Sequence, residues 1–141
     1  MVILDTDHVS LLEWSGSPPA QKLDTRLSQL LSNETCTTII SYEEQLRGWL
    51  GMLAKASKQP AQIEIYGRLK SQLNNYCRLT VLTFNEHAAI EFARLRKEHP
   101  RLGTMDLKIA AIVLSQDATL LSRNRKDFGQ ITGLKLEDWT T

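Results

Sequence analysis

The chain has 141 residues and a formal net charge of +1, which argues against the strongly basic surface of a non-specific nucleic-acid coat. This length suits one core, and we expect a single domain over residues 1–141. Cys36 and Cys77 have neither metal-ligand spacing nor a disulfide-rich context. The start of the sequence lacks a basic signal-peptide region, and the longest apolar run, 109–114, is too short for a bilayer. We therefore expect a cytoplasmic protein with no membrane contact.

The first ten residues place a carboxylate directly after an apolar run. Residues 2–4 are typical of a strand buried on both faces, and Asp5 follows where that strand leaves the sheet. Thr6 and Asp7 begin an expected helix. Because ligands of open α/β sheets bind beyond the carboxyl ends of strands, Asp5 is a candidate metal ligand or nucleophile. The alternative is that Asp5 or Asp7 only caps the helix.

The rest of the sequence alternates between strands and helices. A turn cluster over 15–19 ends the first helix. The apolar spacing then predicts helices over 20–31, 42–58, 61–79, 86–99 and 105–116, the third and fourth helices of the chain forming a hairpin. β-branched and apolar runs predict strands over 35–40, 80–84, 118–121 and 134–136, with a polar turn over 123–131. This order predicts an α/β fold with a mainly parallel central sheet of four to five strands flanked by helices.

Carboxylates occupy equivalent places in these units. Asp5 follows the first strand, Glu43 and Glu44 lie in the first turn after the second, and Asp106 and Asp127 flank the fourth. In a parallel sheet these positions meet at one end. Two unit charges at ~4 Å repel by about 4 kcal/mol at an effective dielectric of ~20, so such a cluster must share protons or bind a cation. Oxygen ligands without His or Cys favour Mg²⁺ or Mn²⁺.

Each acid also has a purely structural explanation. Ser41 and Glu44 have the spacing of a capping box. Asp106 lies two residues after Thr104, where a negative charge suits the helix dipole, and Asp127 is an ordinary turn residue. Four acids at the same end of successive units are harder to explain in this way than any one of them.

Taken in order, five motifs resemble the PIN-domain ribonucleases of the VapC type, the toxins of toxin–antitoxin pairs. They are ILDTD at 3–7, ISYEEQLRG at 40–48, GTMDLKIAA at 103–111, LLSRNRKDF at 120–128 and GLKLEDW at 133–139. The resemblance covers nearly the whole chain. It implies a PIN-like fold and a Mg²⁺- or Mn²⁺-dependent endoribonuclease acting on RNA, often tRNA or ribosomal RNA. It also implies a cognate antitoxin partner and a homodimer.

The resemblance assigns roles to residues of this chain. Asp5 matches the first acid of the family and Asp106 the third; Glu44 best matches the second because Gly48 follows four residues later, with Glu43 as the rival. These acids would hold the metal, with Glu44 orienting or deprotonating the attacking water. Members of the family differ at the fourth position, which is either Asn124 or Asp127 here, and Asn124 puts a second metal ion in doubt. Ser122 would orient water at the metal.

Two basic stretches are candidates for RNA contacts. The denser one comprises Arg94, Arg96, Lys97, His99 and Arg101, and the other comprises Arg123, Arg125 and Lys126. Phosphate contacts from such residues would be sensitive to salt. The alternative is a solvated helix end, where basic residues suit the C-terminal dipole.

Two other functions fit parts of the pattern. DTDHV also matches the start of haloacid-dehalogenase-like phosphatases, with Asp5 as phosphoryl acceptor and Asp7 as general acid, although the chain is short for them and leaves Glu44 and Asp127 without a role. A non-catalytic PIN-fold interaction module is the second alternative. Trp14, Trp49, Met52 and Leu53 are candidates either for a hydrophobic groove that binds an antitoxin segment or a second copy, or for the core.

Overall fold

The computed structural model describes residues 1–13 and 16–141. Its centre is a five-stranded sheet with the order β3-β2-β1-β4-β5, in which every neighbouring pair is parallel. The strands are β1 (Val2–Leu4), β2 (Thr35–Thr38), β3 (Thr80–Leu82), β4 (Thr119–Leu121) and β5 (Lys135–Glu137). The predicted α/β architecture is confirmed, and the sheet has the upper of the two expected strand numbers.

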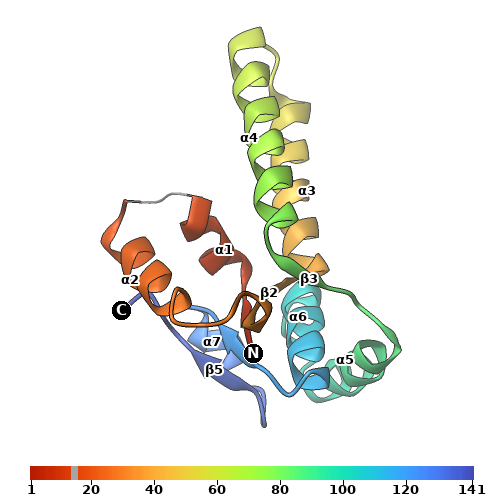
Figure 1. Cartoon of the computed structure of the whole chain (residues 1–141). Coiled ribbons are helices and arrows are strands. Elements are labelled where there is room, and N and C mark those ends of the chain that lie inside the picture. Colours follow the sequence, from red (N-terminus) through yellow and green to blue (C-terminus); the bar gives the residue numbers. More distant parts are fainter. Residues whose placement is uncertain (14–15) are drawn as a thin grey trace.

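Helices connect the strands and cover both faces of the sheet (Figure 1). They are α1 (Thr6–Glu13), α2 (Pro18–Leu27), α3 (Ile39–Lys55), α4 (Gln59–Cys77), α5 (Glu86–Glu98), α6 (Thr104–Ser115) and α7 (Arg125–Phe128), with a 3₁₀ turn at Ser32–Glu34. Helices α3 and α4 run side by side as the predicted hairpin, which projects away from the sheet in Figure 1. None of the helices within the described residues is long and apolar enough to cross a membrane.

The alternation of side chains along the short strands divides the core in two. Ile3 of β1 and Leu120 of β4 belong to a cluster with α5 and α6, whereas Leu4 and Leu121 belong to one with α1 and α2. Both strands are buried on both faces, as their apolar runs predict. Helix α6 is also buried nearly all round, from Leu107 to Val113. These tightly packed central elements hold in place the end of the sheet, at the carboxyl ends of the strands, where Asp5 and Asp106 lie.

Two predicted helix starts were wrong. Ile39 and Ile40 belong to α3 and not to the second strand, and the N-cap is Thr38, whose hydroxyl accepts the Ser41 N–H at 3.1 Å. The capping box predicted between Ser41 and Glu44 is therefore absent, which leaves the Glu44 side chain available for other contacts. Helix α6 begins at Thr104, one residue before the predicted start at 105, and its N-cap is Gly103.

The other boundaries differ by a few residues, and the turn predicted over 123–131 contains the short helix α7. Asn85 is the N-cap of α5, and its side chain accepts the Ala88 N–H at 3.0 Å. Trp14 and Ser15 lie outside the described residues, so the groove position predicted for Trp14 and the beginning of the turn cluster stay predictions.

Candidate active site at the carboxyl ends of the strands

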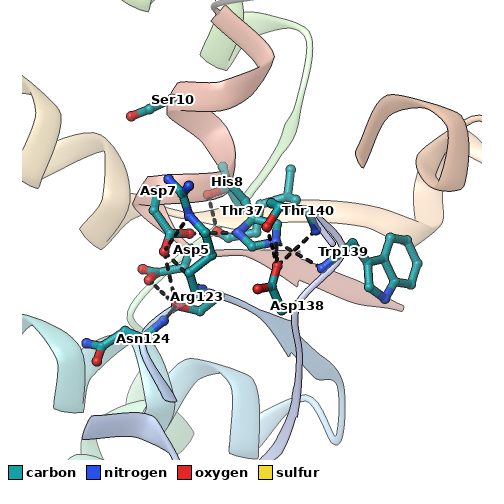
Figure 2. A network of polar contacts seen from close by, with 12 residues as sticks. Asp5, Asp7, His8, Ser10, Thr37, Arg123, Asn124, Asp138, Trp139 and Thr140 are labelled. Carbon is teal, nitrogen blue, oxygen red and sulfur yellow. Dashed lines mark hydrogen bonds and ion pairs between the residues drawn. The ribbon is translucent and has the colours of Figure 1, made fainter. Parts of the chain in front are cut away.

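The two central strands place Asp5, which is labelled in Figure 2, next to Ser122. Asp5 follows β1, and its backbone N–H donates to the Leu121 carbonyl of β4 at 2.9 Å. Ser122 follows β4, and its hydroxyl donates to Asp5 Oδ2 at 2.7 Å. Because β1 and β4 are parallel and in register, the residues after both strands must meet here.

Asp5 is only 7% exposed, and the environment of its carboxyl group disfavours the charged form. Burial raises its pKa to about 7; the Ser122 hydrogen bond opposes this rise, and the charges of Asp7 and Glu44 add to it. A buried carboxyl group surrounded by other carboxyl groups is suited to binding a cation, which would restore its ionised form.

The structure separates the two glutamates of α3. Glu44 Oε1 accepts a hydrogen bond from Thr6 Oγ1 at 3.0 Å, which turns its carboxylate toward the residue after Asp5. Glu43 instead forms an ion pair with Arg47 of the next helical turn, at 2.6 Å. Burial raises the pKa of Glu44, and the charges of Asp106 and Glu43 raise it further against the opposing Thr6 hydrogen bond. These contacts favour Glu44 over Glu43 as the acid of α3.

Asp106 lies in the first turn of α6. Its pKa is raised by burial and by the charges of Asp127 and Asp7. The charges that act on Asp106 come from α1 and α7, so acids from three separate elements lie near one another.

Asn124 and Asp127 form one unit at the start of α7. Asn124 is the N-cap, with its Oδ1 accepting the Asp127 N–H and its Nδ2 donating to Asp127 Oδ2, both at 3.2 Å. The backbone N–H of Asn124 donates to the Ser122 hydroxyl at 3.0 Å. The two candidates for the fourth position are therefore held together, and the Ser122 hydroxyl bonds to Asp5 and to the Asn124 backbone.

The structure also gives Asp7 and His8 a place that the sequence did not predict. Asp7 accepts the Arg123 backbone N–H at Oδ2, at 3.0 Å, and its Oδ1 lies 2.7 Å from Nδ1 of the fully buried His8. Burial raises the pKa of Asp7, but these hydrogen bonds outweigh it and the net pKa is lowered. The sequence does contain one signal for this contact: a histidine follows an acid directly, on a helix that must pack against the sheet.

The basic residues fall into two groups. Arg94 pairs with Glu91 and Glu98 on α5, and Arg96 donates to the carbonyls of His99 and Leu102, so both have structural contacts. By contrast, the side chains of Arg101, Arg125 and Lys126 are exposed, and Arg123 is nearly half-exposed, with Nε 4.0 Å from Asp7 Oδ2. The exposed cations at 123–126 lie in the segment that also carries Asn124 and Asp127.

A cleft of about 370 Å³ adjoins the acids between α1 and α3. It shares Thr6 and Glu44 with the site, and its other lining residues are Ser10, Glu13, Gln45, Gly48, Trp49 and Met52. Trp49 and Met52 thus line a groove, whereas Leu53 is not among its described lining residues, and the binding of an antitoxin segment or a second copy there stays a prediction.

The donor set fits a hard divalent cation. Asp5, Glu44 and Asp106 offer carboxylate oxygens only, and each has its pKa raised by burial and by neighbouring acids. Within residues 1–13 and 16–141, no group of three His, Cys, Asp or Glu side chains is close enough to form a ready-made metal cage. Mg²⁺ is commonly held by one or two carboxylates and keeps several waters, so an open arrangement suits it.

Comparison with known proteins gives consistent matches. The sequence matches the PIN domain family over residues 2–134. It is 32% identical over 120 residues to ribonuclease VapC1 of Haemophilus influenzae (strain R2866), covering 82% of both chains. It is 35% identical over 66 residues to the tRNA(fMet)-specific endonuclease VapC of Salmonella typhimurium, covering 44% of this chain and 50% of the relative. The solved structure of VapBC-1 from nontypeable Haemophilus influenzae superposes with a TM-score of 0.76 at 29% identity, covering 100% of both chains.

Proposed function

Since the chain belongs to the PIN domain family, and within it to the VapC ribonucleases, we propose that it is a divalent-metal-dependent endoribonuclease that hydrolyses phosphodiester bonds in RNA. The observation that supports this most directly is that Asp5, Glu44 and Asp106 lie near the carboxyl ends of the strands, each with a pKa raised by burial and by neighbouring acids. Such a cluster is costly without a cation and becomes favourable with one.

Each residue of the site has a separate role in the proposed hydrolysis. Asp5 and Asp106 would hold Mg²⁺ or Mn²⁺, which when bound offsets the charge that builds on the phosphoryl oxygens. Glu44, held through Oε1 by Thr6, orients the attacking water and accepts its proton; a raised pKa makes it a better base. Asn124 and Asp127 would help to place either a second ion or the leaving-group side of the substrate. Arg125 and Lys126 contact the RNA backbone, joined by Arg123 and Arg101.

The biological role proposed is that of a toxin blocked by a cognate antitoxin. Its support is the likeness to VapBC-1 together with the five motifs. The cleft beside Glu44 is where an inhibitory segment would close the site. Because the Salmonella typhimurium relative is named as specific for tRNA(fMet), tRNA is the first substrate to test, with ribosomal RNA as the second.

The test compares Asp106→Asn with Asp24→Asn, an exposed aspartate of α2. Both proteins are incubated with 5′-labelled tRNA and ribosomal RNA in Mn²⁺, in Mg²⁺ and in EDTA, and circular dichroism confirms folding. We expect internal cleavage that needs the metal, is unchanged in Asp24→Asn, and falls about 100-fold or more in Asp106→Asn. Undiminished cleavage by folded Asp106→Asn contradicts the proposal.

Two further readouts separate the alternatives. A phosphatase would release phosphate from a small phosphomonoester and leave RNA uncut. A non-catalytic module would cut nothing, and titration calorimetry would show no Mn²⁺ binding that depends on Asp5.

A further inference from the structure

The His8 side chain lies between Trp139, near the end of the chain, and Asp7, beside the candidate active site (Figure 2). It is fully buried on α1. The backbone N–H of Trp139 donates to His8 Nε2 at 3.4 Å, and an N–H can donate only to a ring nitrogen that carries no proton. The proton of the neutral ring is therefore on Nδ1, which donates to Asp7 Oδ1 at 2.7 Å. The C-terminal segment thus selects the tautomer that Asp7 needs.

The second oxygen of Asp7 holds the turn that follows β4. Oδ2 accepts the Arg123 N–H at 3.0 Å and lies 3.5 Å from the Ser122 hydroxyl. That hydroxyl donates to Asp5 and accepts from the Asn124 N–H. Asp7 is therefore connected to the Asp5 carboxyl group through Ser122, and to the α7 cap residue Asn124 through the Arg123 backbone.

The C-terminal segment 138–140 is itself anchored. The Trp139 ring has the Arg26 guanidinium of α2 4.3 Å above it. Asp138 accepts from the backbone and hydroxyl of Thr140 and lies 3.8 Å from His8 Nε2. Trp139 and Thr140 are buried. His8 consequently contacts a fixed support and not a loose tail.

We propose that Asp7 and His8 are positioning residues, which carry the placement of segment 138–140 to the turn 122–124 and so hold Asp5, Asn124 and Asp127 in the geometry needed for RNA hydrolysis. This proposal rests on the nuclease function proposed above. Neither residue needs to touch the substrate. A hydrogen-bonded second layer of this kind orients the groups that do the chemistry, as partners of metal-ligating side chains do elsewhere.

The hydrogen-bond pattern makes the two positions chemically selective. Asp7 accepts from both His8 and Arg123, which a carboxylate does with its two oxygens and an amide cannot do. The amide of Asp7→Asn can take two orientations. With its oxygen toward His8, it loses the hydrogen bond from the Arg123 N–H. With its NH₂ group toward His8, Nδ1 must accept, so the ring proton moves to Nε2 and faces the Trp139 N–H. At position 8, an Asn amide nitrogen falls near the place of Nδ1, whereas a Gln amide reaches the place of Nε2.

The experiment measures kcat and KM for Mn²⁺-dependent RNA cleavage by His8→Asn, His8→Gln and Asp7→Asn. His87→Asn and His87→Gln on the exposed surface of α5 are the matched controls. We expect His8→Asn to keep kcat within about threefold, and His8→Gln and Asp7→Asn to lose about tenfold or more in kcat with little change in KM. Equal activity of folded His8→Asn and His8→Gln would overturn the proposal, since only core packing would then matter.

A second measurement uses the wild-type protein without RNA. The ¹⁵N chemical shifts of the His8 ring should show Nδ1 protonated, and the Arg123 amide should exchange slowly and become fast in Asp7→Asn. A proton on Nε2, or an unprotected Arg123 amide in the wild type, would overturn the proposal. Because this arm needs no catalysis, an inactive wild type with the expected shifts would count against the nuclease function alone.

Discussion

At the scale of single residues, Asp5 makes a prediction about stability and pH. Its pKa is about 7 when folded against 3.8 for the free group, so between those values the folded state holds a proton that the unfolded state has lost. The contribution of Asp5 to the free energy of unfolding must therefore fall as pH rises from about 4 to 7 and stay low above it. A difference of about three pKa units corresponds to roughly 4 kcal/mol.

We expect Asp5→Asn to unfold at a higher denaturant concentration than the wild type at pH 8 in EDTA, and this advantage to vanish near pH 4. Mn²⁺ should stabilise the wild type at pH 8 and leave Asp5→Asn unchanged, because the metal replaces the missing proton. Urea titrations at both pH values provide the measurement, with the exposed Asp24→Asn as control. A stability difference that does not vary with pH would show that Asp5 does not carry this ionisation cost.

At the scale of elements, the sequence predicted where the acids would lie because parallel strands bring their carboxyl ends together. The positions of Asp5, Glu44 and Asp106 follow from that rule. The start of α3 was predicted less well, since the run TTII suits a strand and both Thr38 and Ser41 are good caps. Glu43 and Glu44 could be separated only through Thr6 and Arg47, which the fold brings to them.

The contacts of His8 could not be predicted at all from local patterns. Its partners are the adjacent Asp7 and the backbone of Trp139, 131 residues away. Only the pairing of β4 with β5 brings the end of the chain back to α1 and the turn after β4. A buried polar residue whose partner depends on tertiary structure gives no periodic signal.

Helix α7 makes the prediction that belongs to this scale. Its residues Arg125 and Lys126 are exposed beside Asn124 and Asp127. Reversing both charges should weaken RNA binding and reduce the slope of log affinity against log salt by about 1.4, since each phosphate contact to a single strand contributes about 0.7. Fluorescence anisotropy of labelled RNA, in an Asp106→Asn background that does not cleave it, measures both quantities.

The matched control is the double reversal of Lys55 and Lys58 at the far end of the α3–α4 hairpin. It changes the net charge of the protein by the same amount. If both double variants lower affinity and slope equally, RNA responds to the overall charge and the predicted contact at α7 is wrong.

At the scale of the whole molecule, most of the α3–α4 hairpin lies away from the sheet and does not serve to cover it. It projects from the body (Figure 1), and α4 carries Ile63, Tyr66 and Leu73 on one face with 72%, 59% and 49% of their surface exposed. Exposed apolar side chains gathered on one helix face are typical of a protein interface. The expected homodimer would bury this face.

We therefore expect the wild type to sediment as a dimer and Ile63→Glu to weaken the association at least tenfold, because a buried charge at the interface must be desolvated without a partner. Ile90→Glu is the matched control, since Ile90 is 69% exposed but lies on α5, and it should remain dimeric. Sedimentation velocity over a concentration series distinguishes the three proteins. A monomeric wild type, or equal dissociation of both variants, would exclude the hairpin face as the dimer contact. The face would then be a candidate contact for the antitoxin.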